Sequence, residues 1–195
     1  SSVPALLYYT YIPVIVLSLL FSVFVLVKDK FSLLSKLFFL ISTFFSLWVL
    51  NILVQWASNS VVTQMLAWQL TIFFEIPIFI FAFYFAAVFF EQKDIKFPLK
   101  LLLLILALPI LVLLPTQFNV ESFYLTEDDC GGNNGLLWSY AYVLEITLLV
   151  WVLFWGLKKS FSANVDKVFQ KQVLLLTIGL VTFLSIFFIS NYLGE

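Results

Sequence analysis

Two acidic residues, Glu75 and Glu145, lie deep inside long apolar stretches of the sequence, and no lysine stands at the same depth. Ionisable residues are costly inside a membrane, so they are candidates for function by default. If these stretches are membrane helices, Glu145 lies roughly 14 Å and Glu75 roughly 21 Å from the outer boundary. Each carboxyl either binds a proton, cation or ligand, or serves as a structural hydrogen-bonding group between helices.

Polar and aromatic residues recur at helical spacing around these acids. Residues three or four apart share one face of a helix, and three apolar stretches carry such a stripe: Gln64, Trp68, Thr71 and Glu75; Trp138, Tyr142 and Glu145; Trp48, Asn51 and Gln55. The stripes predict a ligand-binding cavity that opens toward the outer side. Interhelical hydrogen bonding by Asn, Gln and Thr is the alternative interpretation. The candidate ligand-binding residues are Trp48, Asn51, Gln55, Trp68, Gln69, Glu75, Tyr142 and Glu145, with Gln69 included because it neighbours Trp68.

The composition excludes an ordinary soluble domain as the scaffold for these residues. Of 195 residues, 63% are hydrophobic and only 11% are charged, whereas a soluble domain has about half apolar and about a quarter charged residues. A net charge of −1 without arginine argues against nucleic acid as a partner. The chain has no histidine and no nucleotide-binding, HExxH or nucleophile-elbow motif. We therefore expect no enzyme, no cofactor and no metal site.

Six apolar stretches are long enough to cross a bilayer as helices, which takes roughly 20 residues each. They cover about 6–27, 33–57, 61–90, 98–115, 136–157 and 172–193. The sequence thus predicts one all-α transmembrane domain over 1–195, a bundle of six helices. Pro77 lies within the third stretch and predicts a kink beside Glu75.

The lysines set the expected orientation. All ten fall near the loops after the first, third and fifth stretches. By the positive-inside rule these loops are cytoplasmic, so the N-terminus and, after six crossings, the C-terminus are outside. We expect an integral membrane protein of the bacterial cytoplasmic membrane.

The longest outer loop, about 116–135, contains the acidic run Glu127, Asp128 and Asp129 followed by Cys130 and two glycines. Oxygen ligands next to glycine are able to hold Ca²⁺, but the regular alternation of an EF-hand loop is absent. We predict a solvated turn here. Cys130 is the single cysteine, so it cannot form an intramolecular disulfide.

Three segments carry a resemblance to a known family. Residues 28–39 form a polar turn that leads into a second helix with Trp48, residues 135–140 open the fifth helix after a Gly- and Asn-rich loop, and residues 170–179 form a basic, Gln-containing entry to the sixth. In these features the chain resembles the N-terminal seven-transmembrane sensor module of bacterial histidine kinases. The resemblance implies a module truncated after six helices. The phosphoacceptor and ATPase parts would then lie beyond this chain, because it has no histidine.

The expected function is a sensory or receptor module that detects an extracellular or intramembrane stimulus and signals to the cytoplasm. Its expected partners are the lipid bilayer, a cytoplasmic signalling domain or partner protein, and a second copy of the chain in a homodimer. Two alternatives stay open at this point: a small transporter in which Glu75 and Glu145 bind a proton or cation, and a non-catalytic subunit of a membrane complex.

Overall fold

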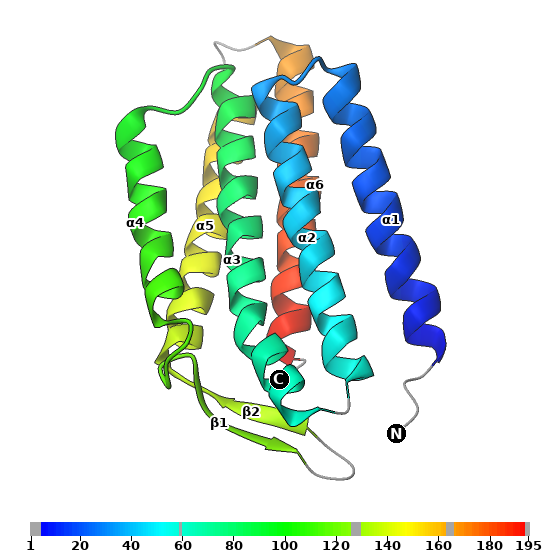
Figure 1. The fold of residues 1–195 in the computed structure, drawn as a ribbon. Coiled ribbons are helices and arrows are strands. Elements are labelled where there is room, and N and C mark those ends of the chain that lie inside the picture. Colours follow the sequence, from blue (N-terminus) through cyan, green and yellow to red (C-terminus); the bar gives the residue numbers. More distant parts are fainter. Residues whose placement is uncertain (1–4, 59, 126–129, 163–165, 194–195) are drawn as a thin grey trace.

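The computed structural model describes residues 5–58, 60–125, 130–162 and 166–193. In these ranges six helices run up and down beside one another (Figure 1), which confirms the all-α bundle. They are α1 (Ala5–Lys28), α2 (Leu33–Ala57), α3 (Val61–Glu91), α4 (Phe97–Leu113), α5 (Leu136–Ser160) and α6 (Lys167–Leu193). Five of the helices are long and apolar enough to cross a membrane. The predicted fourth span, 98–115, corresponds to α4, which has 17 residues and is a shorter apolar helix.

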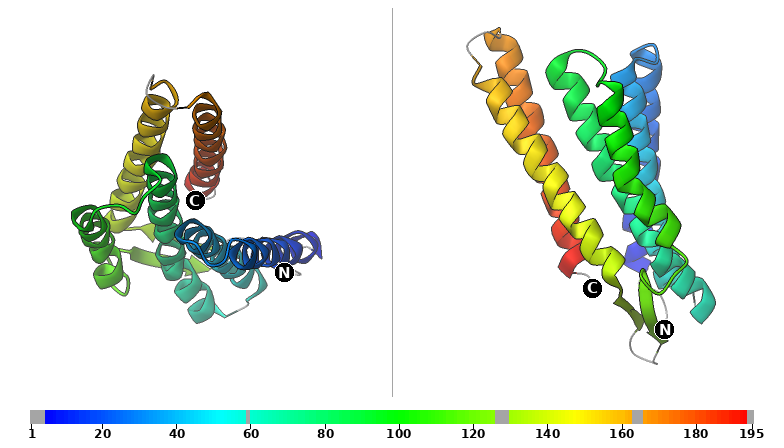
Figure 2. Two further views of the ribbon diagram at one scale, coloured as in Figure 1. Left: turned by 90° about the horizontal axis from the view of Figure 1, so that it is seen from above. Right: turned by 90° about the vertical axis from the view of Figure 1, so that its left-hand side faces the viewer.

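Helix α3 occupies the centre of the bundle. It contacts α2, α4, α5 and α6, and the two further views show these helices grouped around it (Figure 2). Its side chains Phe79, Phe83 and Phe90 are completely buried. A helix that is apolar on all sides is expected to be buried in this way, and α3 continues without interruption through Pro77.

Helix α1 lies at the edge of the bundle, beside α2 (Figure 2). Its apolar side chains are largely uncovered; Leu17 is 65% exposed and Phe21 is 60% exposed. An uncovered apolar surface of this extent is unfavourable in water. The length and apolarity of the helices, together with this surface, indicate a membrane protein.

Local capping explains where several helices begin. The hydroxyl of Ser32 accepts a hydrogen bond from the backbone N–H of Ser35 at the start of α2. At α6, the carboxylate of Asp166 accepts from the N–H groups of Val168 and Phe169 at 3.1 and 3.4 Å. Asp is a favoured N-cap residue, so α6 begins five residues before the predicted span 172–193, at Lys167.

The predicted solvated turn in the loop at about 116–135 is wrong for residues 130–134, which form a strand. The loop contains a β-hairpin in which β1 (Val120–Leu125) pairs antiparallel with β2 (Cys130–Asn134). Val120 is buried, and the ring of Phe123 packs on Trp68 of α3. These β-prone apolar residues fix the hairpin to the bundle. The acidic run Glu127, Asp128 and Asp129 lies outside the described residues.

A close backbone approach joins the hairpin to α5. The N–H of Gly135 donates to the carbonyl of Asn119, and the N–H of Leu137 donates to the carbonyl of Phe118, both at 2.8 Å. A Cβ at position 135 would lie 2.3 Å from the carbonyl oxygen of Phe118. Glycine is therefore required where α5 begins.

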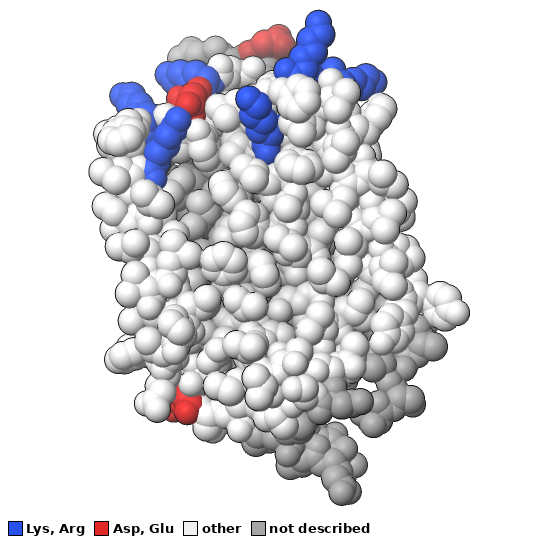
Figure 3. Space-filling view, in the orientation of Figure 1, with Lys and Arg blue, Asp and Glu red and all other residues white. Residues whose placement is uncertain are grey.

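The ten lysines gather at the opposite end of the bundle, where α1 meets α2, α3 meets α4 and α5 meets α6 (Figure 3). Four carboxylates lie at the same end, so among the described residues it carries a net positive charge; they are Asp29, Glu91, Asp94 and Asp166. An apolar belt separates this lysine end from the hairpin end (Figure 3). The alternation of lysine-bearing and lysine-free loops seen in the sequence is thus a separation in space.

Candidate functional site

A buried hydrogen bond connects the central helix to the last one. Glu75 of α3 is 1% exposed, and its Oε1 accepts a hydrogen bond from Nδ2 of Asn191, near the end of α6. The two residues are 116 positions apart in the chain. Because Asn191 is also buried, both partners of this hydrogen bond are shielded from water.

One helical turn toward the lysine end, aromatic rings also join α6 to α3 and α2. Phe187 of α6 lies one turn from Asn191 and packs against Phe79 of α3, with ring centroids 6.0 Å apart. Trp48 of α2 meets Phe187 edge-on at 4.7 Å. The Glu75–Asn191 pair and these rings therefore hold α6 against α3 and α2 at successive turns.

Helix α5 contributes the other predicted acid and a tyrosine. The ring of Tyr142 lies 5.7 Å from Phe188 and 5.5 Å from Tyr192, both on α6. Glu145, one turn farther along α5, is 0% exposed. Two fully buried carboxyl groups thus occur on neighbouring helices, α3 and α5.

The polar stripe of α2 has a different role. Nδ2 of Asn51 donates to the carbonyl of Ala67 at 2.8 Å and to the hydroxyl of Thr71 at 3.1 Å, while Nε2 of Gln55 donates to the same hydroxyl at 2.8 Å. Nε2 of Gln64 donates to the carbonyls of Gln55 and Ser58. These hydrogen bonds join α2 to α3, as the interhelical interpretation of the stripe expects.

Trp68 and Gln69 contact the hairpin region. Nε1 of Trp68 donates to Oδ1 of Asn134 in β2 at 3.1 Å. The backbone carbonyl of Gln69 accepts from Nδ2 of Asn119 at 3.0 Å, just before β1. Both contacts fasten the hairpin end of α3 to the structure that covers it.

The eight candidate residues therefore fall into three groups. Trp48, Glu75 and Tyr142 contact the last turns of α6, with Glu145 buried one turn from Tyr142 on α5; Asn51 and Gln55 join α2 to α3, and Trp68 and Gln69 hold the hairpin. Ligand binding by them stays a prediction. Sequence reasoning missed Asn191, although an amide inside the last predicted span was a usable signal.

Two contacts cross the lysine end. Oε1 of Glu91 accepts from Nε1 of Trp155 at 3.3 Å and lies 3.5 Å from Nζ of Lys159, which ties α3 to α5. In the loop between α3 and α4, a hydrogen bond from Lys100 and then one from Tyr84 hold the pKa of the Asp94 carboxyl below its usual range. Within the described ranges, no group of three or more His, Cys, Asp and Glu residues is arranged to hold a metal ion.

Comparison with known proteins found no matching family model, no matching curated protein and no matching solved structure.

Proposed function

We propose that this chain is a membrane-embedded sensory module with its lysine end in the cytoplasm of a bacterial cell. Lysine-rich loops are retained on the cytoplasmic side of membranes, and the separation of all ten lysines from the hairpin supports this orientation. The hairpin and the buried acids would then be reached from the outer side or from within the bilayer.

The observation that carries the proposal is the hydrogen bond between Glu75 and Asn191. A carboxyl group is retained at bilayer depth at a considerable cost in free energy. Here it holds the outer end of α6, whose other end begins at Lys167 in the lysine end. A stimulus that changes this hydrogen bond therefore acts on a helix that reaches both sides of the membrane.

Helices α5 and α6 are close enough to move as a pair. A Cβ on Gly156 of α5 would lie 2.0 Å from Oγ1 of Thr177 on α6, so the two backbones approach closely near the lysine end. The loop that joins them connects to Lys158, Lys159, Lys167 and Lys171. A ligand or proton that binds one arrangement of this pair more tightly shifts the equilibrium toward it, and a cytoplasmic partner reads the change at the loop.

Distance measurements at the lysine end test this proposal. Spin labels are placed on Lys36→Cys at the start of α2 and Val168→Cys at the start of α6, in a Cys130→Ser background in lipid nanodiscs. Both sites are exposed. Pulsed electron paramagnetic resonance then gives the distance distribution at pH 5 and pH 8. Besides Glu75 and Glu145, this part of the bundle carries two titratable side chains, Tyr142 and Tyr192.

The matched variants are Glu75→Gln and Glu145→Gln, which keep a hydrogen-bonding oxygen but cannot titrate. We expect the distribution to change with pH in the parent protein and to become independent of pH in the double variant. A distribution that is identical at both pH values in the parent, or an unchanged pH response in the double variant, contradicts a proton as the stimulus acting through Glu75 and Glu145.

The presence of two buried carboxyls on the neighbouring helices α3 and α5 favours one further candidate, a proton- or cation-coupled transporter. Liposomes with an entrapped pH dye distinguish the two functions. The sensory proposal expects proton flux equal to that of protein-free liposomes, whereas a transporter gives a faster flux that Glu75→Gln abolishes.

A further inference from the structure

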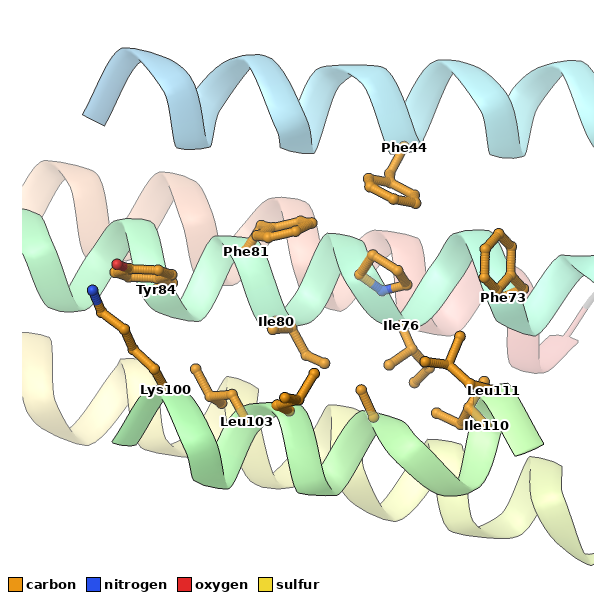
Figure 4. Close-up of a pocket in the computed structure, with 13 residues that line it drawn as sticks. Phe44, Phe73, Ile76, Ile80, Phe81, Tyr84, Lys100, Leu103, Ile110 and Leu111 are labelled. Carbon is orange, nitrogen blue, oxygen red and sulfur yellow. The ribbon is translucent and has the colours of Figure 1, made fainter. Parts of the chain in front are cut away.

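An elongated groove of about 360 Å³ lies between α3 and α4, and neither Glu75 nor Asn191 lines it. Its walls are apolar side chains of both helices, with Phe44 of α2 above them (Figure 4). Leu104 and Leu111 line it and are also 60% and 50% exposed. The groove therefore opens sideways in the apolar belt, where the hydrocarbon of the bilayer surrounds the protein.

One end of the groove is cationic. Lys100 lies there beside Tyr84, with Nζ 5.6 Å from the centre of the tyrosine ring, while Phe73 and Leu111 lie at the other end (Figure 4). Nζ of Lys100 donates to Oδ2 of Asp94 at 2.5 Å. A lysine ammonium has three N–H donors, so donors remain for a second anionic group.

The dimensions of the groove identify its occupant. From Lys100 to Leu111 the groove follows α4 for about 16 Å. The hydrocarbon core of a bilayer is roughly 30 Å thick, so this length matches the hydrocarbon of one leaflet. The volume of about 360 Å³ is the space open to the centres of water-sized spheres, and spread over that length it is about 5 Å across. With the radius of about 1.4 Å of such a sphere added on each side, the groove is about 8 Å wide, whereas a helix with its side chains is about 10–12 Å wide. One extended hydrocarbon chain fits this width, and a helix does not.

We propose that this groove binds one acyl chain of an anionic membrane lipid from the leaflet at the lysine end. The chain lies between α3 and α4, and the headgroup phosphate receives a charge-assisted hydrogen bond from Lys100. Lys93 and Lys96, in the adjoining loop, add positive charge near the headgroup. The site is distinct from the proposed sensory contact and does not depend on it.

Native mass spectrometry tests the proposal on the full chain in detergent. The protein is titrated with dioleoyl phosphatidylglycerol or, in parallel, with dioleoyl phosphatidylcholine, which has the same chains without a net charge. We expect one saturable phosphatidylglycerol adduct with an affinity about tenfold above that for phosphatidylcholine. Equal affinity for the two lipids overturns the assignment of an anionic headgroup.

Two pairs of variants locate the adduct. Ala107→Phe fills the groove and should abolish the adduct, whereas Leu108→Phe, at the next and more exposed position of α4, should retain it. Lys100→Gln should weaken phosphatidylglycerol binding about tenfold, whereas Lys171→Gln, at an exposed position of α6, which does not line the groove, should change it less than twofold. Far-UV circular dichroism confirms that each variant is folded.

Two results would contradict the site. If Ala107→Phe and Leu108→Phe bind the lipid equally, the lipid does not occupy this groove. If the parent protein appears as a lipid-free dimer that Ala107→Phe converts to a monomer, a second copy of the chain covers the groove instead.

Discussion

The contact between Gly156 of α5 and Thr177 of α6 gives a sharp prediction about packing. In Gly156→Ala the new Cβ would lie 2.0 Å from Oγ1, 2.7 Å from Cγ2 and 2.9 Å from Cβ of Thr177. Carbon atoms pack best at about 3.5–4.0 Å, so the two helices have to separate by roughly 1 Å or more at this level. Overpacking of this kind costs about 1–3 kcal/mol.

The measurement is the free energy of unfolding in mixed micelles, titrated with dodecyl sulfate and followed by far-UV circular dichroism. Gly179→Ala on α6 is the matched control, because nothing lies within 4 Å of its Cβ. Alanine is favoured over glycine inside a helix by up to about 1 kcal/mol, so the control should be neutral or stabilising. Gly156→Ala should be destabilising despite the same gain in helix propensity.

A double variant assigns the loss to the contact. Thr177→Ala removes Oγ1 and Cγ2, so in the Gly156→Ala background it should recover at least half of the lost stability. Contacting residues show such non-additive effects, whereas distant ones add. Additive effects of the two substitutions, or equal effects of Gly156→Ala and Gly179→Ala, would refute the close approach of α5 and α6.

Three further outcomes follow from the contacts between the elements. Thr71→Val removes the hydroxyl that joins α2 to α3 and should lower the free energy of unfolding by about 0.6–2 kcal/mol in the same assay. Thr147 is exposed and its hydroxyl bonds within its own helix, so Thr147→Val should lower it by less than about 0.5 kcal/mol. Equal losses would contradict the role of Thr71 in joining the two helices. Trp68→Phe breaks the hydrogen bond to Asn134, so amide hydrogen exchange over residues 120–134 should accelerate while the helices keep their protection. Because the pKa of Asp94 is lowered in the folded protein, its ionised carboxyl stabilises the fold above the unfolded pKa of about 3.9, and this stabilisation is lost as the pH falls through the folded pKa. The free energy of unfolding of Asp94→Asn should lack this acid-dependent part. Coincident curves of unfolding free energy against pH for the two proteins would show that the ion pair contributes nothing.

The sequence predicts burial better than it predicts partners. Glu75 and Glu145 were expected to lie deep in the bundle because the apolar stretches around them allow no other place for them, and both are almost fully buried. The partner Asn191 depends on how α6 packs against α3, two helices far apart in the chain. Local helical spacing contains no information about that packing.

The same limit explains the polar stripes. The spacing of Asn51 and Gln55 places them on one face of α2, and that face meets α3. Trp68, on the predicted stripe of α3, instead meets Asn134 in a hairpin that the sequence did not suggest. The acidic and glycine residues of the loop dominated its interpretation, whereas Val120 and Phe123, which pack on the bundle, determine its structure.

The most direct test of the sensory proposal is to break the Glu75–Asn191 contact at one end of α6 and observe the other end. Asn191→Leu removes the donor, and Ser190→Leu, at the neighbouring exposed position, is the control. With spin labels at positions 36 and 168, we expect Asn191→Leu to shift the distance distribution at the lysine end and Ser190→Leu to leave it unchanged. If Asn191→Leu is folded and gives the parent distribution, α6 does not transmit a change at Glu75 to the lysine end, and the sensory proposal is contradicted.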